Sequence, residues 1–303
     1  MHAAGVYVHV PFCVQKCIYC DFLSFSVGKN SAKNSAKNIY VAALLNEIKN
    51  ARTNKLFAHG IDSVYIGGGT PTALPAPLLC EILRAVASLP LLPGAEFTVE
   101  TNPGTHEYFA ALKTHGVNRL SFGVQSTHDF LLRTLGRIHT KEDFIKNFRA
   151  ARDAGFDNIN VDLMFSLLGQ TTAHWRETLA EITLLSPEHI SAYSLTPAEN
   201  TPLHEQLEAG AIHLPSDETD RDMYHTARRI LAEAGYIHYE ISNFAKPGRE
   251  SRHNVNCWTM RPYIGFGLGA HSFDGNARWH NIEDMEQYIS CHVLPLQTNR
   301  SIS

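Results

Sequence analysis

Three of the six cysteines stand close together near the N-terminus, with a spacing typical of a metal centre. They are Cys13, Cys17 and Cys20, in the pattern Cys-x3-Cys-x2-Cys, directly after an apolar segment that ends at Val10. Thiolates at these intervals on one loop can point at a common centre, as in iron–sulfur and zinc sites. The alternative is a chance grouping of three buried cysteines.

The number of thiols narrows the choice of metal. Structural zinc takes four protein ligands, and ordinary ferredoxin clusters take four cysteines. Here the position where a nearby fourth thiol could stand is Phe22. A 4Fe–4S cluster held by three cysteines leaves one iron without a protein ligand, and an open metal position is where a small molecule can coordinate and react. The spacing therefore predicts a cluster suited to passing one electron into a bound ligand.

The segments around these cysteines resemble the radical S-adenosylmethionine (SAM) superfamily. Tyr19 precedes the last cysteine, and Tyr7–Phe12 and Cys20–Phe22 are similar to the oxygen-independent coproporphyrinogen III oxidases and the related haem chaperones. The resemblance runs, with interruptions, from about Tyr7 to Ser272. It implies that the open iron chelates the amino and carboxylate groups of SAM. It also implies that an electron from the cluster cleaves SAM to a 5′-deoxyadenosyl radical.

The same resemblance implies a set of SAM-binding residues. Glu100 could accept hydrogen bonds from ribose hydroxyls or an amino group, and Arg137 offers a fork suited to a carboxylate. The Gly67–Thr70 run lacks side chains, so that a ligand can lie against its backbone. The alternatives are a tight turn for the glycines, a surface position for Arg137 and plain packing for the tyrosines. The implied residues are Tyr7, Tyr19, Gly68, Gly69, Thr70, Glu100, Gln125, Arg137 and Asp162.

A second motif, from His253 to Trp258, resembles the haem-chaperone branch of the family. Cys257 stands where tyrosine is usual in that branch. Because histidine and cysteine both ligate haem iron, His253 and Cys257 are candidate haem ligands. The alternative is a structural His-Asn turn with Trp258 in the core. The glycine run at 265–269 indicates either a close approach of the chain to a cofactor or a plain loop.

Two functions follow from these motifs. One is a haem chaperone that keeps the cluster and SAM, carries haem or a porphyrin as cargo, passes haem to acceptor proteins and draws on an electron donor protein. The other is an oxygen-independent coproporphyrinogen III oxidase, which converts propionate side chains to vinyl groups. The oxidase pattern has a fourth cysteine where this chain has Phe22. The resemblance also implies that oxidases carry a substantial extension before the first strand, whereas the first expected strand here begins at Val6. These differences and the His253–Trp258 motif favour the chaperone.

Composition is ordinary for a soluble globular protein, with 44% hydrophobic and 18% charged residues. A net charge of −4 without a basic block gives no indication of a nucleic-acid partner. No apolar run is long enough to span a membrane. Cys80, Cys257 and Cys291 are isolated, which favours a reducing compartment. Cytoplasm is therefore expected, and peripheral membrane contact is left open.

The spacing of apolar residues along the chain predicts strands that alternate with helices. This is the pattern of parallel strands joined by crossover helices. Six such units, not eight, predict a partial (β/α)6 barrel, in agreement with the resemblance; a doubly wound sheet is the alternative. Candidate site residues follow these strands, where such barrels carry their chemistry. The expected strands are Val6–Val10, Ile61–Ile66, Glu96–Val99, Asn118–Phe122, Asn158–Phe165 and His189–Leu195; helices are expected from Ile39, around Leu78–Val86, and at His106–His115, Lys141–Ala154 and Thr172–Leu185.

The regular alternation of strands and helices ends near position 197. This change predicts a barrel domain over 1–197 and a smaller α+β region over 198–303. That region resembles a shortened form of the family's C-terminal part. Between Lys29 and Asn38 the unit Ser-Ala-Lys-Asn repeats in tandem. A polar repeat has nothing to bury, so it is predicted to be a flexible surface insertion.

Overall fold

The computed structural model describes residues 2–26 and 34–293 of the chain, and its main feature is one sheet of eleven strands. Six of these strands pair side by side, in parallel and in chain order, which confirms the predicted partial barrel. A doubly wound sheet would reverse its strand order at the centre, and this sheet does not. The six are β1 (Ala4–Val10), β4 (Ile61–Gly68), β5 (Leu91–Thr101), β6 (Arg119–Gln125), β7 (Ile159–Phe165) and β8 (His189–Ser194).

The two faces of this sheet differ in chemistry. Val64 and Ile66 of β4 belong to the hydrophobic core that packs against the helices. Tyr65 lies between them and points the other way, because side chains alternate along a strand, and its hydroxyl donates to Glu100 Oε1 at 2.8 Å. On β6 and β7, Ser121 donates to Asp162 Oδ2 in the same manner at 3.1 Å. The concave face is therefore polar, and it forms a cavity rather than a packed barrel core.

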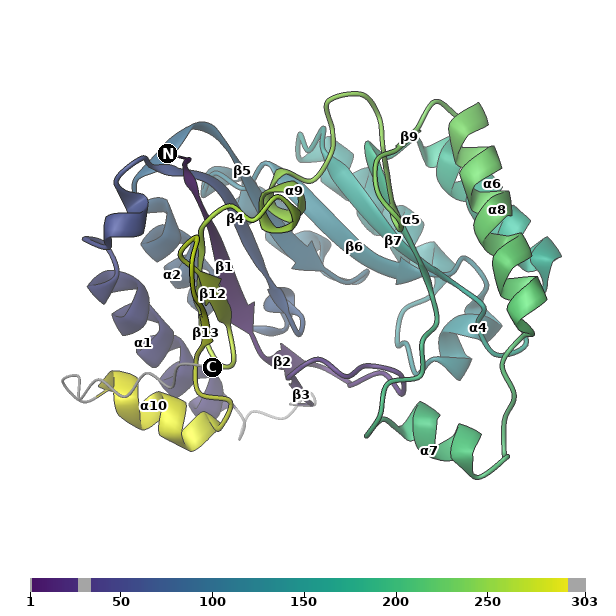
Figure 1. The fold of residues 1–303 in the computed structure, drawn as a ribbon, viewed down its shortest axis with the longest axis horizontal. Coiled ribbons are helices and arrows are strands. Elements are labelled where there is room, and N and C mark those ends of the chain that lie inside the picture. Colours follow the sequence, from purple (N-terminus) through teal and green to yellow (C-terminus); the bar gives the residue numbers. More distant parts are fainter. Residues whose placement is uncertain (1, 27–33, 294–303) are drawn as a thin grey trace.

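The helices cover the convex face of the sheet, with α1 and α2 towards one edge and α6 and α8 towards the other (Figure 1). Thr140 and Thr171 each form a capping box at the start of a helix, which explains why the sequence placed these two starts correctly. The bounds are α1 (Asn34–Asn50), α2 (Ala76–Ala87), α3 (Phe109–Thr114), α4 (Asp129–Thr134), α5 (Lys141–Asp153), α6 (Thr172–Leu185) and α8 (Asp217–Glu233).

Helix α1 begins earlier than predicted, inside the Ser-Ala-Lys-Asn repeat. Residues 27–33 lie outside the described residues, but Asn34 to Asn38 are helical. Lys37 is buried, and its ammonium donates to the carbonyl of Ala73 at 2.9 Å. The prediction of a flexible insertion is therefore wrong for this second half of the repeat, because a lysine there finds a buried carbonyl acceptor.

Residues after 197 extend both edges of the same sheet. Strands β9 (Ile237–His238) and β10 (Asn243–Ala245) continue it antiparallel beyond β8. At the other edge β11 (Tyr263–Phe266) runs parallel to β1 and is followed by β12 (His271–Phe273) and β13 (Arg278–His280). The remaining helices are α7 (Pro202–Glu208), α9 (Arg252–Trp258) and α10 (Met285–Val293). A domain boundary at 197 stays a prediction.

Strand β11 was not predicted, because its glycines indicated a loop. A Cβ on Gly265 would clash with the carbonyl of His271, and one on Gly267 would meet the carbonyl of His9. These glycines therefore let neighbouring strands and turns pack closely. No helix in the described part of the chain is both long and apolar enough to cross a membrane.

Candidate functional site: a cysteine-lined cavity at the strand ends

The three cysteines lie on a loop that is held to the barrel by backbone hydrogen bonds. Strands β2 (Phe12–Cys13) and β3 (Phe25–Ser26) pair and close its base. At its tip, the amide of Ile18 donates to the carbonyl of Leu135 at the end of α4, at 3.2 Å. The carbonyl of Ile18 accepts from the amide of Leu203, in α7, at 3.0 Å. The loop is therefore positioned by protein contacts alone.

This loop forms one wall of a cavity of about 510 Å³ at the C-terminal ends of the strands, a volume typical of a small-molecule site. The cavity brings together most of the residues that the sequence singled out. They are Cys13, Cys17, Tyr19, Cys20, Gly68, Gly69, Thr70, Glu100, Gln125, Arg137 and Asp162. Tyr7, His253 and Cys257 do not line it.

The three thiols fit an iron–sulfur cluster in their chemistry, since cysteine thiolates are its usual ligands. All three are free and partly exposed. Among the described residues no three His, Cys, Asp or Glu side chains lie close enough to share one metal ion. A cubane needs no such convergence, because each thiolate binds a different iron. Burial raises the pKa of Cys13 and of Cys20, so that metal binding would release their protons.

The glycine run after β4 packs against protein on the side where side chains would stand. A Cβ on Gly67 would lie 2.6 Å from the Glu100 carboxylate, and one on Gly68 would lie 2.3 Å from His9 Nδ1. A Cβ on Gly69 would lie 2.7 Å from the carbonyl of Phe12. The glycines are therefore required for packing, while Gly68 and Gly69 still present backbone to the cavity.

Glu100 is held by two donors at the cavity wall. The Tyr65 hydroxyl donates to Oε1 at 2.8 Å, and the amide of Gly68 donates to Oε2 at 3.1 Å. Burial outweighs these bonds and raises the pKa of Glu100 to about 7. The carboxyl can therefore exist in both protonation states near neutral pH.

Asp162 and Gln125 occupy the strands opposite. Asp162 accepts from Ser121 Oγ at 3.1 Å and from Asn160 Nδ2 at 2.8 Å, and burial raises its pKa. Gln125 ends β6 in the left-handed region, with φ of 69°. This conformation is uncommon for a residue other than glycine and is often found at functional sites. Gln125 in this conformation lines the cavity at the end of β6.

Arg137 faces the cavity and not the outer surface. Its Nη2 donates to Asn102 Oδ1 at 2.8 Å and also to the carbonyl of Gly123, and its Nη1 donates to Cys17 Sγ at 3.5 Å. Its Nε is buried without a partner. The guanidinium is therefore fixed beside one cysteine, and its Nε–H is left for a ligand or water.

The cavity contains residues that the sequence did not single out. Many of them alternate with apolar residues on the strands, a period-two pattern that could have marked them as inward-facing. Asn102 was interpreted only as part of a turn. The added residues are Gln15, Lys16, Asp21, Tyr65, Thr101, Asn102, Ser121, Gly123, Met164, Tyr193, Ser194, Thr196 and Ala198.

The candidate haem ligands lie at the opposite end of the strands, on α9, whereas the cysteine loop follows the C-terminal ends of the strands (Figure 1). Glu96 accepts from the amides of Arg252 and His253 at 2.9 and 3.0 Å and so caps this helix. His253 is only 6% exposed, and its ring stacks on Tyr65, with the centroids 5.4 Å apart. Burial, and then Arg119, lower the pKa of His253 to about 4, so the imidazole is neutral.

Tyr7 belongs to this interior layer. Its hydroxyl bonds to His9 Nδ1 at 2.9 Å, and its ring lies 6.5 Å from that of His253. His253 Nδ1 is buried without a partner, and its Nε2 lies 3.9 Å from Cys257 Sγ. The imidazole is therefore paired with the one thiol on α9.

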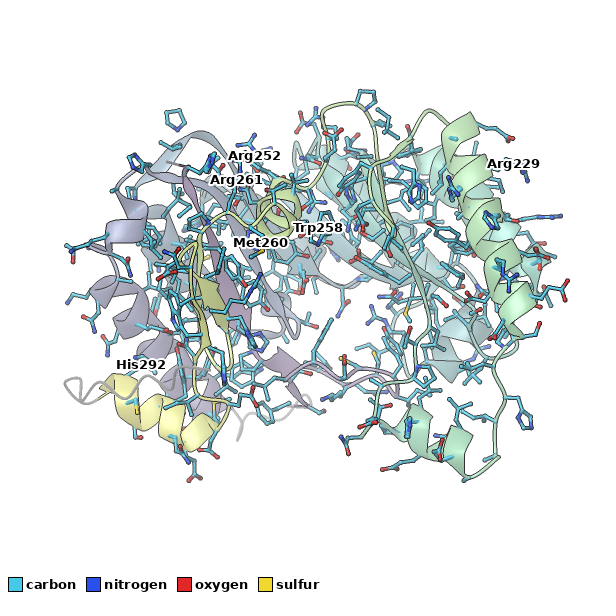
Figure 2. All side chains as sticks on the ribbon, viewed as in Figure 1. Arg229, Arg252, Trp258, Met260, Arg261 and His292 are labelled. Carbon is cyan, nitrogen blue, oxygen red and sulfur yellow. The ribbon has the colours of Figure 1, made fainter. Side chains whose placement is uncertain are left out.

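Trp258 is not in the core, contrary to the alternative weighed from the sequence. It is 49% exposed and Met260 is 52% exposed, because α9 turns this end to solvent. Arg252 and Arg261 are grouped with them around α9 (Figure 2). Arg278 also contacts Met260, with Nη2 3.2 Å from Sδ. Arg261 also pairs with Asp62, with Nη1 3.6 Å from Oδ2. The exposed Trp258 and Met260 thus have arginines beside them.

Comparison with known proteins gives consistent similarities. The family model for the radical SAM superfamily matches residues 7–182. The chain is 38% identical over 291 residues to the heme chaperone HemW of Bacillus subtilis, covering 94% of this chain and 75% of that protein. It is 38% identical over 272 residues to HemW of Escherichia coli, covering 88% of this chain and 69% of that one.

A solved structure shares the fold. Coproporphyrinogen III oxidase (HemN) from Escherichia coli, a radical SAM enzyme, superposes with a TM-score of 0.81. The match covers 95% of this chain and 69% of that one, with 24% sequence identity. At this identity the superposition establishes a common fold and no more.

Proposed function

Because the chain belongs to the radical SAM superfamily and, within it, to the family of the haem chaperone HemW, we propose that it is a haem chaperone with a 4Fe–4S cluster and bound SAM. The observation that carries this proposal is a cavity lined by three thiols with no fourth thiol among its lining residues. Cys13, Cys17 and Cys20 would hold the cluster. When bound, such a cluster supplies one electron to a SAM molecule that is coordinated at its open iron.

The remaining cavity residues would bind and orient SAM. Arg137 has a charge and a spare donor for the methionine carboxylate. Backbone at Gly68 and Gly69 would meet the amino group, and Glu100 would accept from ribose hydroxyls or from that group. Gln125 and Asp162 face the same space from the opposite strands. Reduction of the cluster requires an electron donor protein, and haem would pass to acceptor proteins.

Affinity for SAM is expected to depend on the protonation of Glu100. Since its pKa is about 7, the accepting carboxylate is present above pH 7 and is lost as pH falls. SAM should therefore bind about tenfold more tightly at pH 8 than at pH 6 through this group. Equilibrium binding to the reconstituted protein measures it. In Glu100→Gln this component should vanish, and an unchanged profile in the variant would rule out the role.

We propose that haem docks on the exposed surface of α9. Trp258 offers a face for the porphyrin ring, and Arg252, Arg261 and Arg278 are suited to its propionates. Cys257 is partly exposed and could ligate the iron from this side. His253 is neutral, the form that binds metals, but it would require α9 to shift before it reached a haem.

A haem titration tests this surface. Cys257→Ser should change the absorption spectrum of the haem complex and weaken binding, because it removes the iron ligand. Cys291→Ser removes a thiol on α10 and should bind haem like wild type. The double variant Arg252→Ala/Arg261→Ala should weaken binding without a spectral change, because propionate contacts do not alter ligation. Equal spectra and affinities for all four proteins would refute the haem surface.

The chaperone and the oxidase differ in a direct assay. Under anaerobic conditions with SAM, a reductant and coproporphyrinogen III, we expect haem binding in parallel samples and no protoporphyrinogen IX. Phe22, at the position of the oxidase's additional cysteine, is 62% exposed at the cavity mouth and brings no thiol to the reaction. Steady formation of protoporphyrinogen IX would contradict the chaperone proposal.

A further inference from the structure

Asn102 joins two of the three cluster cysteines through a chain of hydrogen bonds. Its Oδ1 accepts from Arg137 Nη2 at 2.8 Å, and its Nδ2 donates to Thr70 Oγ1 at 2.8 Å. Arg137 Nη1 lies 3.5 Å from Cys17 Sγ, and Thr70 Oγ1 lies 3.7 Å from Cys13 Sγ. The amide of Asn102 therefore connects the two side chains that bond to these thiols.

The chemistry of the partners fixes the direction of every bond in this chain. Arginine has donors only, so the oxygen of Asn102 must face Arg137 and its nitrogen must face Thr70. Because the Thr70 hydroxyl accepts from that nitrogen, its own hydrogen is free to point at Cys13. Every bond in the chain is therefore donated away from the guanidinium, directly to Cys17 and through Asn102 and Thr70 to Cys13. Consecutive hydrogen bonds with the same donor-to-acceptor direction polarise one another.

We propose that Asn102 is a positioning residue that sets the redox potential of the cluster, through Thr70 at Cys13 and through Arg137 at Cys17. Hydrogen bonds to cluster sulfurs stabilise the more negative, reduced state, and so raise the reduction potential. Asn102 itself touches no thiol in the described hydrogen bonds. The inference rests on the proposed cluster, but it concerns the side chains around it.

The test is a redox titration of the reconstituted cluster without SAM, followed by electron paramagnetic resonance. Asn102→Leu should keep its iron and sulfide and shift the midpoint potential to a more negative value. If that variant loses iron, Thr70→Val tests the branch to Cys13, since it removes the hydroxyl donor without adding a charge. Thr105→Val is the matched control. It removes a 2.8 Å bond to the backbone carbonyl of Asn102 and leaves the side-chain relay intact, so its potential should equal that of wild type.

A double-variant cycle identifies the route. If Asn102 acts through Thr70, Thr70→Val should also lower the potential, and the pair with Asn102→Leu should shift it by less than the sum. Unchanged potentials in Asn102→Leu and Thr70→Val, or a change in SAM affinity alone, would overturn the inference and leave the proposed function standing. Wild-type protein that takes up no cluster would overturn both.

Discussion

Replacing Cys13, Cys17 and Cys20 together by alanine is expected to abolish cluster binding. Wild-type protein should take up about four iron and four sulfide per chain on anaerobic reconstitution, and the triple variant should take up almost none. The physical reason is that cysteine thiolates are the ligands that hold such clusters, and the triple variant leaves none on this loop. Iron and acid-labile sulfide assays, with visible absorption, measure the result.

The fold should survive this change, because backbone hydrogen bonds at Ile18 still anchor the loop when the thiols are removed. A matched control is the double variant of Cys80 and Cys291, which lie on α2 and α10 outside the cavity. It should bind a full cluster. If the control lost its iron while the triple variant kept it, the cluster would have to be placed elsewhere.

Replacing Arg137 by leucine is expected to weaken SAM binding by about a hundredfold or more, the usual cost of removing one partner of a buried charge pair. Leucine removes the guanidinium that faces the cavity and leaves the Gly123 carbonyl and Asn102 Oδ1 without their donor. Arg137→Lys keeps the charge but loses the two-pronged donor geometry, so its affinity for SAM should lie between those of wild type and Arg137→Leu. Calorimetric titration of SAM into reconstituted protein measures the affinities.

Arg133 provides the control, since it lies on α4, shortly before Arg137 in the chain, and is exposed. Arg133→Leu should bind SAM as wild type does. Iron content and unfolding temperature should be measured for each variant, because the unpaired acceptors alone can cost about 1–3 kcal/mol of stability. An Arg137→Leu protein with a full cluster and unchanged SAM affinity would remove Arg137 from the proposed site.

The apolar part of the fold was readable from the sequence. Strands such as Ile159–Phe165 are buried over nearly their whole length, so hydrophobic runs and their turns gave their positions to within a few residues. Helix Thr172–Leu185 was predicted with its observed bounds, because Thr171 caps it. The convergence of the cysteines, Glu100 and Asp162 followed from one rule, that parallel strands end at one face.

What the sequence did not reveal depends on contacts between distant segments. Strand β11 is stabilised by pairing with β1, and its glycines are required by neighbours that only the fold brings near. Trp258 reaches solvent because Glu96, far away in the chain, fixes the start of α9. Asn102 has the chemistry of a turn residue, and its bonds to Thr70 and Arg137 appear only when the ends of β4 and β5 meet the segment after α4.

The central claim is a cluster on three thiols whose open iron is available to SAM. The most direct test is electron paramagnetic resonance of the reduced, anaerobically reconstituted protein with and without SAM. We expect the signal of a reduced 4Fe–4S cluster, and a change in its g values when SAM is added, because SAM would coordinate the iron that lacks a thiolate. A spectrum identical with and without saturating SAM would contradict the account.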